Sequence, residues 1–427
     1  GATLLAVSRL QYTTRGAGPP LLAGNFATGG EGLPHVEGRM ERRQGGALAM
    51  RMAMAEYRSG DARIAVPRFS LVQLGGGALG FSGEARLAGA LPRGRAVGPV
   101  LPIEGNWSPR AGVALWRRCT VIGFERLTLA DFSFDRRRLP LCPPPGTAIV
   151  RSDGRGTRIA AGVPSLDLTG RLGATPIRIR SGAAGMALPG TLDVRDVDVA
   201  LGPAATASRF RIARLGARIG NEVAGRFAGS EVLLAAVPLD IREASGAWRF
   251  ADGRLTLSQA GFRLSDRAVD SRFQPLVARD AALVLADNRI VADAILREPA
   301  SDREVVRAAI RHDLASGSGT ADLAVPGILF DDKLQPDTIS RLALGVLANT
   351  YGTVRGEGRI AWDDRGVTST GRFTTDSLDF AAAFGPLKGL SGTVAFTDLL
   401  GLVTAPDQQL RIASINPGIE VTDGLVT

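Results

Sequence analysis

The chain has 427 residues and a net charge of +9, from 51 basic and 42 acidic side chains. Aromatic residues make up only 5% of it, so there are few platforms for stacking bases, and its arginines are scattered singly or in short clusters. No segment approaches the roughly 18–20 continuous apolar residues of a membrane-spanning helix. The composition therefore argues against a nucleic-acid partner and gives no sign of a membrane-spanning helix in these residues.

Glycine is the most informative residue type. The 54 glycines occur about once every eight residues (427/54), close to the strand-plus-turn spacing of all-β proteins. Apolar residues come in short runs, and no Pro/Ser linker or charge block divides the chain. We therefore expect one elongated body over residues 1–427, built of meandering strands with a few short helices. Both ends read as interrupted strands, so we interpret the chain as a fragment of a longer protein.

Two cysteines flank a pair of strand-like segments. Cys119 precedes the segment 120–124, and Cys142 follows the segment 138–141. Antiparallel pairing of these segments would bring the two thiols together, and a bridge there would indicate an oxidising compartment. Two unrelated buried thiols are the alternative.

Apolar residues alternate with polar ones in the segments 248–250, 255–257 and 262–264. Alternate residues of a strand point to the same side of a sheet. We therefore expect the apolar members to share an inner face, while Arg249, Thr256 and Arg263 face water. The same texture continues from 356 to 424, with turns rich in Asp and Gly.

Catalytic motifs are missing. His35 and His312 lie far apart, and neither has metal-ligand spacing around it. Asp313 follows His312 directly, but consecutive strand residues point to opposite faces, which favours a structural histidine. The glycine-rich segments 75–77 and 317–319 are not followed by the Lys-Ser/Thr of a phosphate loop, so we expect turns. The sequence predicts no enzyme, no cofactor and no metal.

Helices are few. The segment from Pro336 to Leu344 has Pro and Asp337 at its start, which is typical of helix entry. Ile339, Leu342, Val346 and Leu347 would make one apolar stripe. A second short piece runs from Phe380 to Phe384. Either the helix near 336–347 caps the sheet or it plugs a groove, and the sequence leaves both open.

A long β body with one apolar face has three ways to use it. The face can form a packed core, turn towards lipid as a barrel, or line an open groove. A membrane barrel is expected to carry aromatic girdles at two depths, and three Tyr and four Trp are too few for them. A packed sandwich or solenoid and an open groove remain.

Three stretches resemble the YdbH branch of the AsmA-like envelope proteins, the repeating-β-groove lipid-transfer family of Gram-negative bacteria. The first runs from Cys119 through Phe124-Glu125-Arg126-Leu127 to Leu141-Cys142-Pro143. The second starts at His312-Asp313-Leu314 and ends at Leu334-Gln335-Pro336. The third, the most specific, includes Gly389-Leu390-Ser391-Gly392, Phe396-Thr397-Asp398-Leu399-Leu400-Gly401-Leu402, Ile415-Asn416-Pro417-Gly418-Ile419 and Asp423-Gly424. The resemblance spans most of residues 80–427.

The resemblance implies a twisted antiparallel sheet curled into a U-shaped groove in the periplasm, which moves phospholipid between the inner and outer membranes. It also implies an inner-membrane anchor outside this fragment and a small outer-membrane lipoprotein that adds strands at the C-terminal end. The alternative is a non-catalytic structural or adhesive β protein with a closed interior. On the groove model we expect these residues to line the lipid route: Trp248, Phe250, Leu255, Leu257, Phe262, Leu264, Ile360, Trp362, Phe373, Val394 and Phe396.

Overall fold

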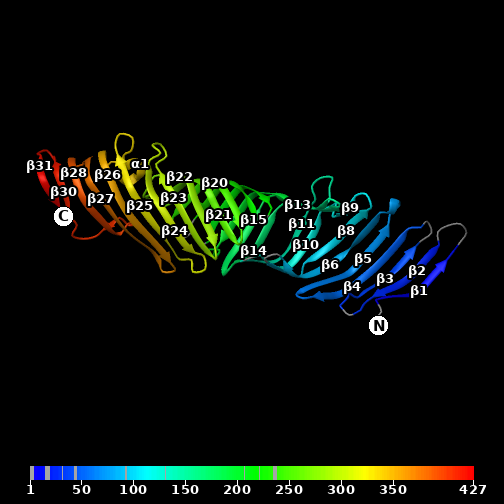
Figure 1. The fold of residues 1–427 in the computed structure, drawn as a ribbon. Coiled ribbons are helices and arrows are strands. Elements are labelled where there is room, and N and C mark those ends of the chain that lie inside the picture. Colours follow the sequence, from blue (N-terminus) through cyan, green and yellow to red (C-terminus); the bar gives the residue numbers. More distant parts are fainter. Residues whose placement is uncertain are drawn as a thin grey trace. The chain divides into compact units, whose positions relative to one another are not determined.

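The structure is a computed structural model. It describes residues 4–427 except 15–19, 31, 43–45, 92–93, 130, 206, 221 and 234–237. The chain divides into two compact units, unit 1 (residues 1–196 and 218–220) and unit 2 (residues 197–217 and 221–427). Figure 1 shows that both consist almost entirely of strands.

Unit 1 contains the first sixteen strands and part of the seventeenth. Their bounds are β1 Leu5–Thr13, β2 Leu21–Thr28, β3 Val36–Arg42, β4 Leu48–Ser59, β5 Ala62–Gln73, β6 Leu79–Leu91, β7 Gly94–Val97, β8 Val100–Ser108, β9 Gly112–Leu115, β10 Thr120–Leu129, β11 Phe132–Leu141, β12 Val150–Asp153, β13 Gly156–Val163, β14 Leu166–Leu172, β15 Thr175–Ser181, β16 Ala184–Leu188 and β17 Gly190–Leu201. Gly75–Gly77 form a one-turn 3₁₀ segment, in which Gly76 has φ of 68°, so the predicted turn is confirmed.

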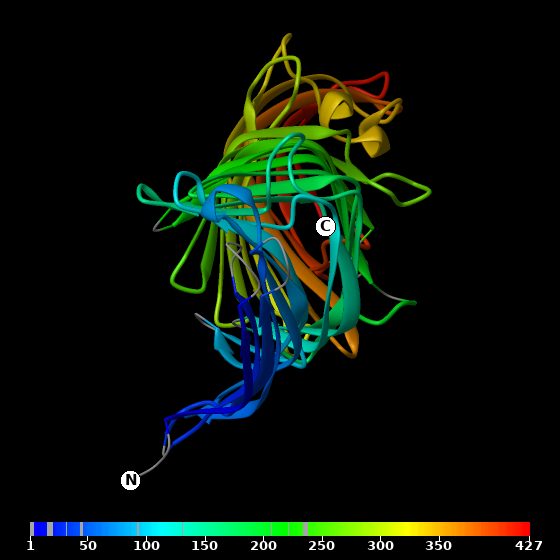
Figure 2. The same cartoon turned by 90° about the vertical axis from the view of Figure 1, so that its right-hand side faces the viewer.

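The strands of unit 1 pair with their neighbours in antiparallel order from β1 to β6, and β6 then pairs with β8. From there the ladders branch. One branch passes through β10, β11, β14 and β15, and the other through β9, β12, β13 and β16. Figure 2 shows the blue strands at the N-terminal end of this unit bent along their length.

The Cys119–Cys142 disulfide lies where the two branches meet. Thr120 pairs with Leu141, so the cysteines stand opposite each other at the end of the β10–β11 hairpin. Cys142 also forms an antiparallel bridge with Gly162 of the other branch. The predicted pairing is therefore confirmed, and the bond closes a separation of 23 residues.

Unit 2 is a meander in chain order. Its strands are β18 Ser208–Ile219, β19 Val223–Leu233, β20 Leu239–Ala251, β21 Arg254–Asp266, β22 Leu276–Ala286, β23 Arg289–Arg297, β24 Glu304–Asp313, β25 Gly319–Phe330, β26 Ala348–Asp363, β27 Gly366–Ala382, β28 Gly385–Asp398, β29 Val403–Thr404, β30 Leu410–Ile415 and β31 Val421–Val426. Each strand from β19 to β28 pairs antiparallel with the next, and β28 continues to β30 and β31. The mainly-β, antiparallel prediction is confirmed.

Two helical predictions are corrected. The helix expected from Pro336 to Leu344 is only α1, Pro336–Ile339, followed by the 3₁₀ turn η2, Arg341–Ala343. Ser340 is extended (φ −138°, ψ 128°), and its hydroxyl accepts a hydrogen bond from the Leu342 N–H, so the helix ends there. The expected apolar stripe is therefore broken.

The piece from Phe380 to Phe384 is not helical. Phe380 pairs with Leu387 and Ala381 with Pro386, so this segment ends β27 and turns into β28. The aromatic rings of Phe380 and Phe384 lie edge to face, 6.5 Å apart. Cross-strand pairing has thus overridden a local spacing that suggested a helix.

The expectation of one uninterrupted body over residues 1–427 stays a prediction. Among the residues that the structure describes, no helix has the length and apolarity needed to cross a bilayer.

Candidate functional site: the sheltered apolar face of unit 2

One row of side chains crosses unit 2 from strand to strand. Each member stands opposite the next in the register of the sheet, and paired residues in antiparallel strands point to the same side. The row is Trp248, Leu257, Leu283, Ala292, Ile310, Ala321, Ile360 and Ser369. All eight are half-buried or buried, and seven are apolar. We call the side of the sheet that carries this row the sheltered face.

A second row lies beside the first. It contains Phe250, Leu255, Leu285, Ile290, His312, Gly319, Trp362 and Val367. Phe373 stands opposite Val394, and Phe396 stands opposite Gly371 on the same side. The register thus places every residue expected to line a lipid route on one face, and the structure leaves each half-buried.

A β-bulge in β21 keeps apolar side chains on this face where the alternation of apolar and polar residues shifts by one position. Leu257 and Phe262 are five positions apart, so strict alternation would put them on opposite sides. Between the pairs Leu257–Leu283 and Ala260–Ala281, β21 advances three residues while β22 advances two. The extra residue is at Gln259, where φ is 50°. The bulge returns Phe262 and Leu264 to the side of Leu257.

The opposite face is charged. Arg311 and Arg359 both reach Asp322, at 3.3 Å and 2.8 Å. Arg249 is exposed and binds Glu222 at 2.6 Å, as expected for a water-facing residue. Thr256 and Arg263 lie on this side too, although they are half-buried. The sheet of unit 2 is therefore amphipathic across its thickness.

His312 belongs to the sheltered face and packs against Trp362. The Trp362 indole N–H donates to His312 Nδ1 at 3.2 Å, and the two rings lie 5.9 Å apart. Burial lowers the pKa of His312 below its ordinary value of 6.5. Acceptance of the Trp362 N–H by Nδ1 is compatible with the structural role that the sequence favoured. His35 instead binds Glu37 at 2.9 Å near the surface.

Part of the sheltered face is closed by the connection between β25 and β26. Ile339 of α1 packs against a cluster of buried residues from β21–β24, which Phe262 and Leu264 also contact. Leu276, which is paired with Leu264, is only 4% exposed. Leu255 and Leu257 are not members of this cluster. One end of the strands is thus packed under α1, while the rows through Leu255 and Leu257 lie outside that packing.

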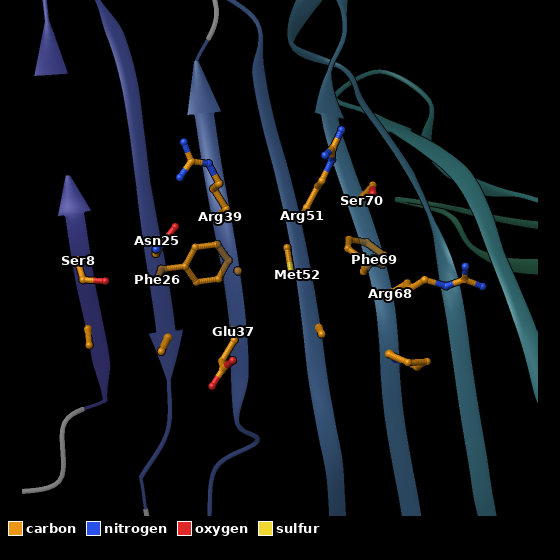
Figure 3. A pocket seen from close by; sticks show the side chains of 15 residues that line it. Ser8, Asn25, Phe26, Glu37, Arg39, Arg51, Met52, Arg68, Phe69 and Ser70 are labelled. Atoms are coloured by element: carbon orange, nitrogen blue, oxygen red, sulfur yellow. The ribbon is translucent and has the colours of Figure 1, made fainter. Parts of the chain in front are cut away.

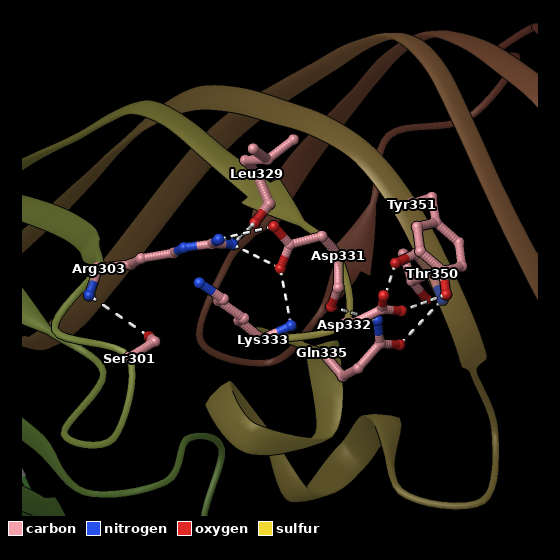
Figure 4. Close-up of polar contacts among 9 residues, drawn as sticks. All are labelled: Ser301, Arg303, Leu329, Asp331, Asp332, Lys333, Gln335, Thr350 and Tyr351. Atoms are coloured by element: carbon pink, nitrogen blue, oxygen red, sulfur yellow. Dashed lines mark hydrogen bonds and ion pairs between the residues drawn. The ribbon is translucent and has the colours of Figure 1, made fainter.

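The base of this connection is held by polar contacts, shown in Figure 4. Arg303 binds both carboxylate oxygens of Asp331, at 2.8 Å and 2.6 Å. This pairing contributes most to lowering the pKa of Asp331 to about 2. The Gln335 amide donates to the backbone oxygens of Asp331 and Thr350 and accepts from the Thr350 N–H. Leu334 and Thr350 are each 1% exposed, so the base is well packed.

The tip of the same connection carries apolar side chains into solvent. Leu344 is 67% exposed, and Leu342 and Val346 are also exposed. Leu342 and Val346 were expected in the apolar stripe of a longer helix, so this part of the prediction was wrong. Sequence periodicity could not distinguish a covered stripe from an exposed tip, because the helix stops at Ile339.

A second connection folds onto the same face near β26 and β27. Leu399 lies over Gly358, where an added Cβ would stand 2.7 Å from Leu399 Cδ2. Ser369 donates to Asp398, and the Leu400 N–H donates to Ser369. Glycine at 358 therefore makes room for a loop that covers the end of the first row.

No group of His, Cys, Asp and Glu within the described parts of the chain could hold a metal ion. A hollow in unit 1, of about 680 Å³, has a mixed lining of arginine, serine and apolar side chains over β1–β5 (Figure 3). Charged groups around this hollow pair along one strand, as Arg39 does with Glu41 at 2.8 Å, or across strands, as Arg68 does with Glu84 at 3.6 Å. Within the part of the chain that the structure describes, the sheltered face is extended and chemically uniform.

The comparison with known families decides the assignment. A family model described as "YdbH-like: Intermembrane phospholipid transport protein YdbH" matches residues 2–427. The chain belongs to the YdbH-like family. Neither the curated proteins nor the solved structures yielded a match. The resemblance expected over most of residues 80–427 is confirmed, and the match also includes the N-terminal strands.

Proposed function

We propose that this YdbH-like chain carries phospholipids along its sheltered apolar face, as a non-catalytic part of a bridge between the inner and outer membranes. The observation that carries the proposal is the unbroken row from Trp248 to Ile360. Ala321 is buried and the other six side chains of this stretch keep partial exposure, unlike those of an ordinary surface or of a fully packed core.

The energetics favour such a surface for moving lipid. A diacyl lipid exposes about thirty methylenes, and hydrating each costs about 0.8 kcal/mol, or roughly 24 kcal/mol in all. A continuous apolar wall offsets most of this cost without a specific contact to any atom of the cargo. Such a route requires no nucleophile, general acid or bound metal, which makes an enzymatic role unnecessary to the proposal.

The family and the disulfide support the location that we propose. Membership in an intermembrane phospholipid transport family supports a place in the cell envelope. The Cys119–Cys142 bond is compatible with the oxidising periplasm. We place the protein there, held by an inner-membrane anchor outside residues 1–427. A small outer-membrane lipoprotein would add a strand beyond β31.

Copurification tests the proposal. The protein, purified from the periplasm in mild detergent, should carry phospholipid that mass spectrometry detects above the level of a β-sheet control protein. A variant with Ile310→Asp on the sheltered face should carry less, and Arg311→Asp, its neighbour on the charged face, should carry as much as the wild type. Equal lipid in all three proteins, at the level of the control, would favour the closed structural alternative.

A further inference from the structure

Four of the five methionines of the chain lie between residues 40 and 54. Met40 is in β3 and directly opposite Met50 of β4, while Met52 and Met54 continue along β4 on the same side. All four are half-buried, whereas the alternate residues Arg51 and Ala53 are exposed. The fifth, Met186, stands apart on β16 and is 39% exposed.

The surroundings of the four methionines are apolar and aromatic. Met52 stands opposite Gly38 on one side and Phe69 on the other, and the Phe26 ring lies over Gly38 (Figure 3). Met40 Cε lies 3.7 Å from where a Cβ at Gly24 would stand. Methionine is flexible and fills irregular apolar surfaces, and its sulfur makes favourable contacts with aromatic rings. In unit 1 these residues therefore form a half-buried apolar wall, which we call the methionine cluster.

One polar group interrupts the wall. Arg42 lies two residues beyond Met40 in β3 and shares its side of the strand. Its Nε is buried and has no hydrogen-bond partner among the described residues. A buried donor without an acceptor is unfavourable, and a sulfoxide oxygen formed on a nearby methionine would supply an acceptor.

We propose that the methionine cluster is a reversible oxidation site that closes the lipid route in unit 1. The inference rests on the proposed function, because it takes the cluster as part of the apolar wall along which lipid moves. A peroxide or hypochlorous acid transfers one oxygen atom to the thioether sulfur. The sulfur loses two electrons; hydrogen peroxide is reduced to water, and hypochlorous acid is reduced to chloride with release of its proton. No bond of the chain breaks.

Oxidation changes the wall without removing it. Each sulfoxide replaces an apolar thioether by a strong hydrogen-bond acceptor, so an acyl chain that passes it must displace bound water. Arg42 would hold one such oxygen in place. The change is reversed by a methionine sulfoxide reductase, in which two thiols form a disulfide while the oxygen leaves as water.

The test uses the full chain and a fluorescent phospholipid that moves between phosphatidylethanolamine–phosphatidylglycerol vesicles. The wild type is oxidised with hypochlorous acid until mass spectrometry finds sulfoxide at the four cluster positions. We expect transfer to fall about tenfold. Sulfoxide reductase with a dithiol should restore it. Leucine at all four positions (M40L, M50L, M52L, M54L) should keep transfer before and after oxidation, since leucine conserves volume and apolarity.

Two further variants separate oxidation of the cluster from oxidation elsewhere. Met186→Leu should remain sensitive to the oxidant, because the cluster is intact. Met52→Gln, which places a polar side chain in the wall, should slow transfer without any oxidant, and Met186→Gln should not. Thermal melting of each variant checks that it is folded.

Full transfer by the wild type with all four positions oxidised would overturn the inference. So would a fourfold leucine variant as sensitive as the wild type. An untreated wild type that transfers no lipid would instead overturn the proposed function, and the inference with it. These results are distinguishable because transfer before oxidation is measured first.

Discussion

Two leucines on the sheltered face should respond differently to the same kind of change. Leu264 is paired with Leu276 in the buried cluster under Ile339, while Leu257 lies in the row outside it. Truncating a packed leucine costs about 2–5 kcal/mol, and burying an unpaired polar group costs about 1–3 kcal/mol more. Leu264→Asp should therefore lower the free energy of unfolding by about 4 kcal/mol or more.

Leu257→Glu should be much milder for folding. Full burial of a leucine is worth about 1.5–3 kcal/mol, and a half-buried one loses roughly half of this, about 1 kcal/mol. A carboxylate on an apolar route nevertheless opposes the passage of acyl chains. By analogy with charges inside a bilayer the barrier is about 2.5–3.5 kcal/mol, which slows transfer about 100-fold. The variant should fold but fail to move lipid.

Urea unfolding and lipid transfer between vesicles measure the two effects separately. Thr256→Glu is the matched control, because Thr256 is the neighbour of Leu257 on the opposite face. It should change neither property much. If Leu257→Glu unfolds the protein as Leu264→Asp does, the row is a packed core. If Leu257→Glu and Thr256→Glu transfer lipid equally well, lipid does not follow this face.

Three further outcomes are expected. Cys119→Ser with Cys142→Ser should cost about 3.5 kcal/mol in the chain-entropy model for a 23-residue separation, measured by urea unfolding; an unchanged midpoint would contradict this. Burial lowers the pKa of His312, so the folded state binds fewer protons than the unfolded state and stability should fall as pH drops below about 6.5. His312→Gln should flatten this slope in thermal melts, and parallel slopes would refute it. The hydrogen bonds from Arg303 lower the pKa of Asp331 to about 2. The Arg303–Asp331 pair therefore stabilises the folded state above pH 4, and this stabilisation is lost as the pH falls towards 2. Asp331→Asn should speed amide exchange across residues 335–350 at neutral pH while leaving the strands protected, and unchanged exchange there would contradict the assigned role.

The strands and the disulfide could be predicted because both depend on local pattern. Alternation in Trp248-Arg249-Phe250 determines which side chains share a face. The short hairpin between Cys119 and Cys142 brings the two thiols within bonding distance. These features need only the period of a strand and one reversal of the chain.

The register of the sheet could not be predicted in the same way. The bulge at Gln259 reverses the parity between Leu257 and Phe262, and nothing in the local sequence announces it. The continuous row from Trp248 to Ile360 depends on several such adjustments, in strands whose row residues are up to 112 positions apart (360 − 248). Alternation therefore identified candidate residues in each strand, but only the register joined them.

The connection between β25 and β26 was harder still. The apolar spacing corresponds to a helix only as far as Ile339. The exposure of Leu342 and Val346 depends on the extended backbone at Ser340 and on the hydrogen bonds between Gln335 and Thr350. Such contacts join residues fifteen apart and leave no periodic signal. Likewise, the methionine cluster was not singled out from the sequence, although Met50, Met52 and Met54 alternate in one strand.

Site-specific photo-crosslinking in living cells tests the central claim most directly. A photoreactive amino acid at Ile310, on the sheltered face, and at Arg311, its neighbour on the charged face, samples the two sides of one strand. The account predicts that mass spectrometry detects a phospholipid adduct at position 310 and none at position 311. Adducts of equal yield at both positions, or at 311 alone, would contradict it.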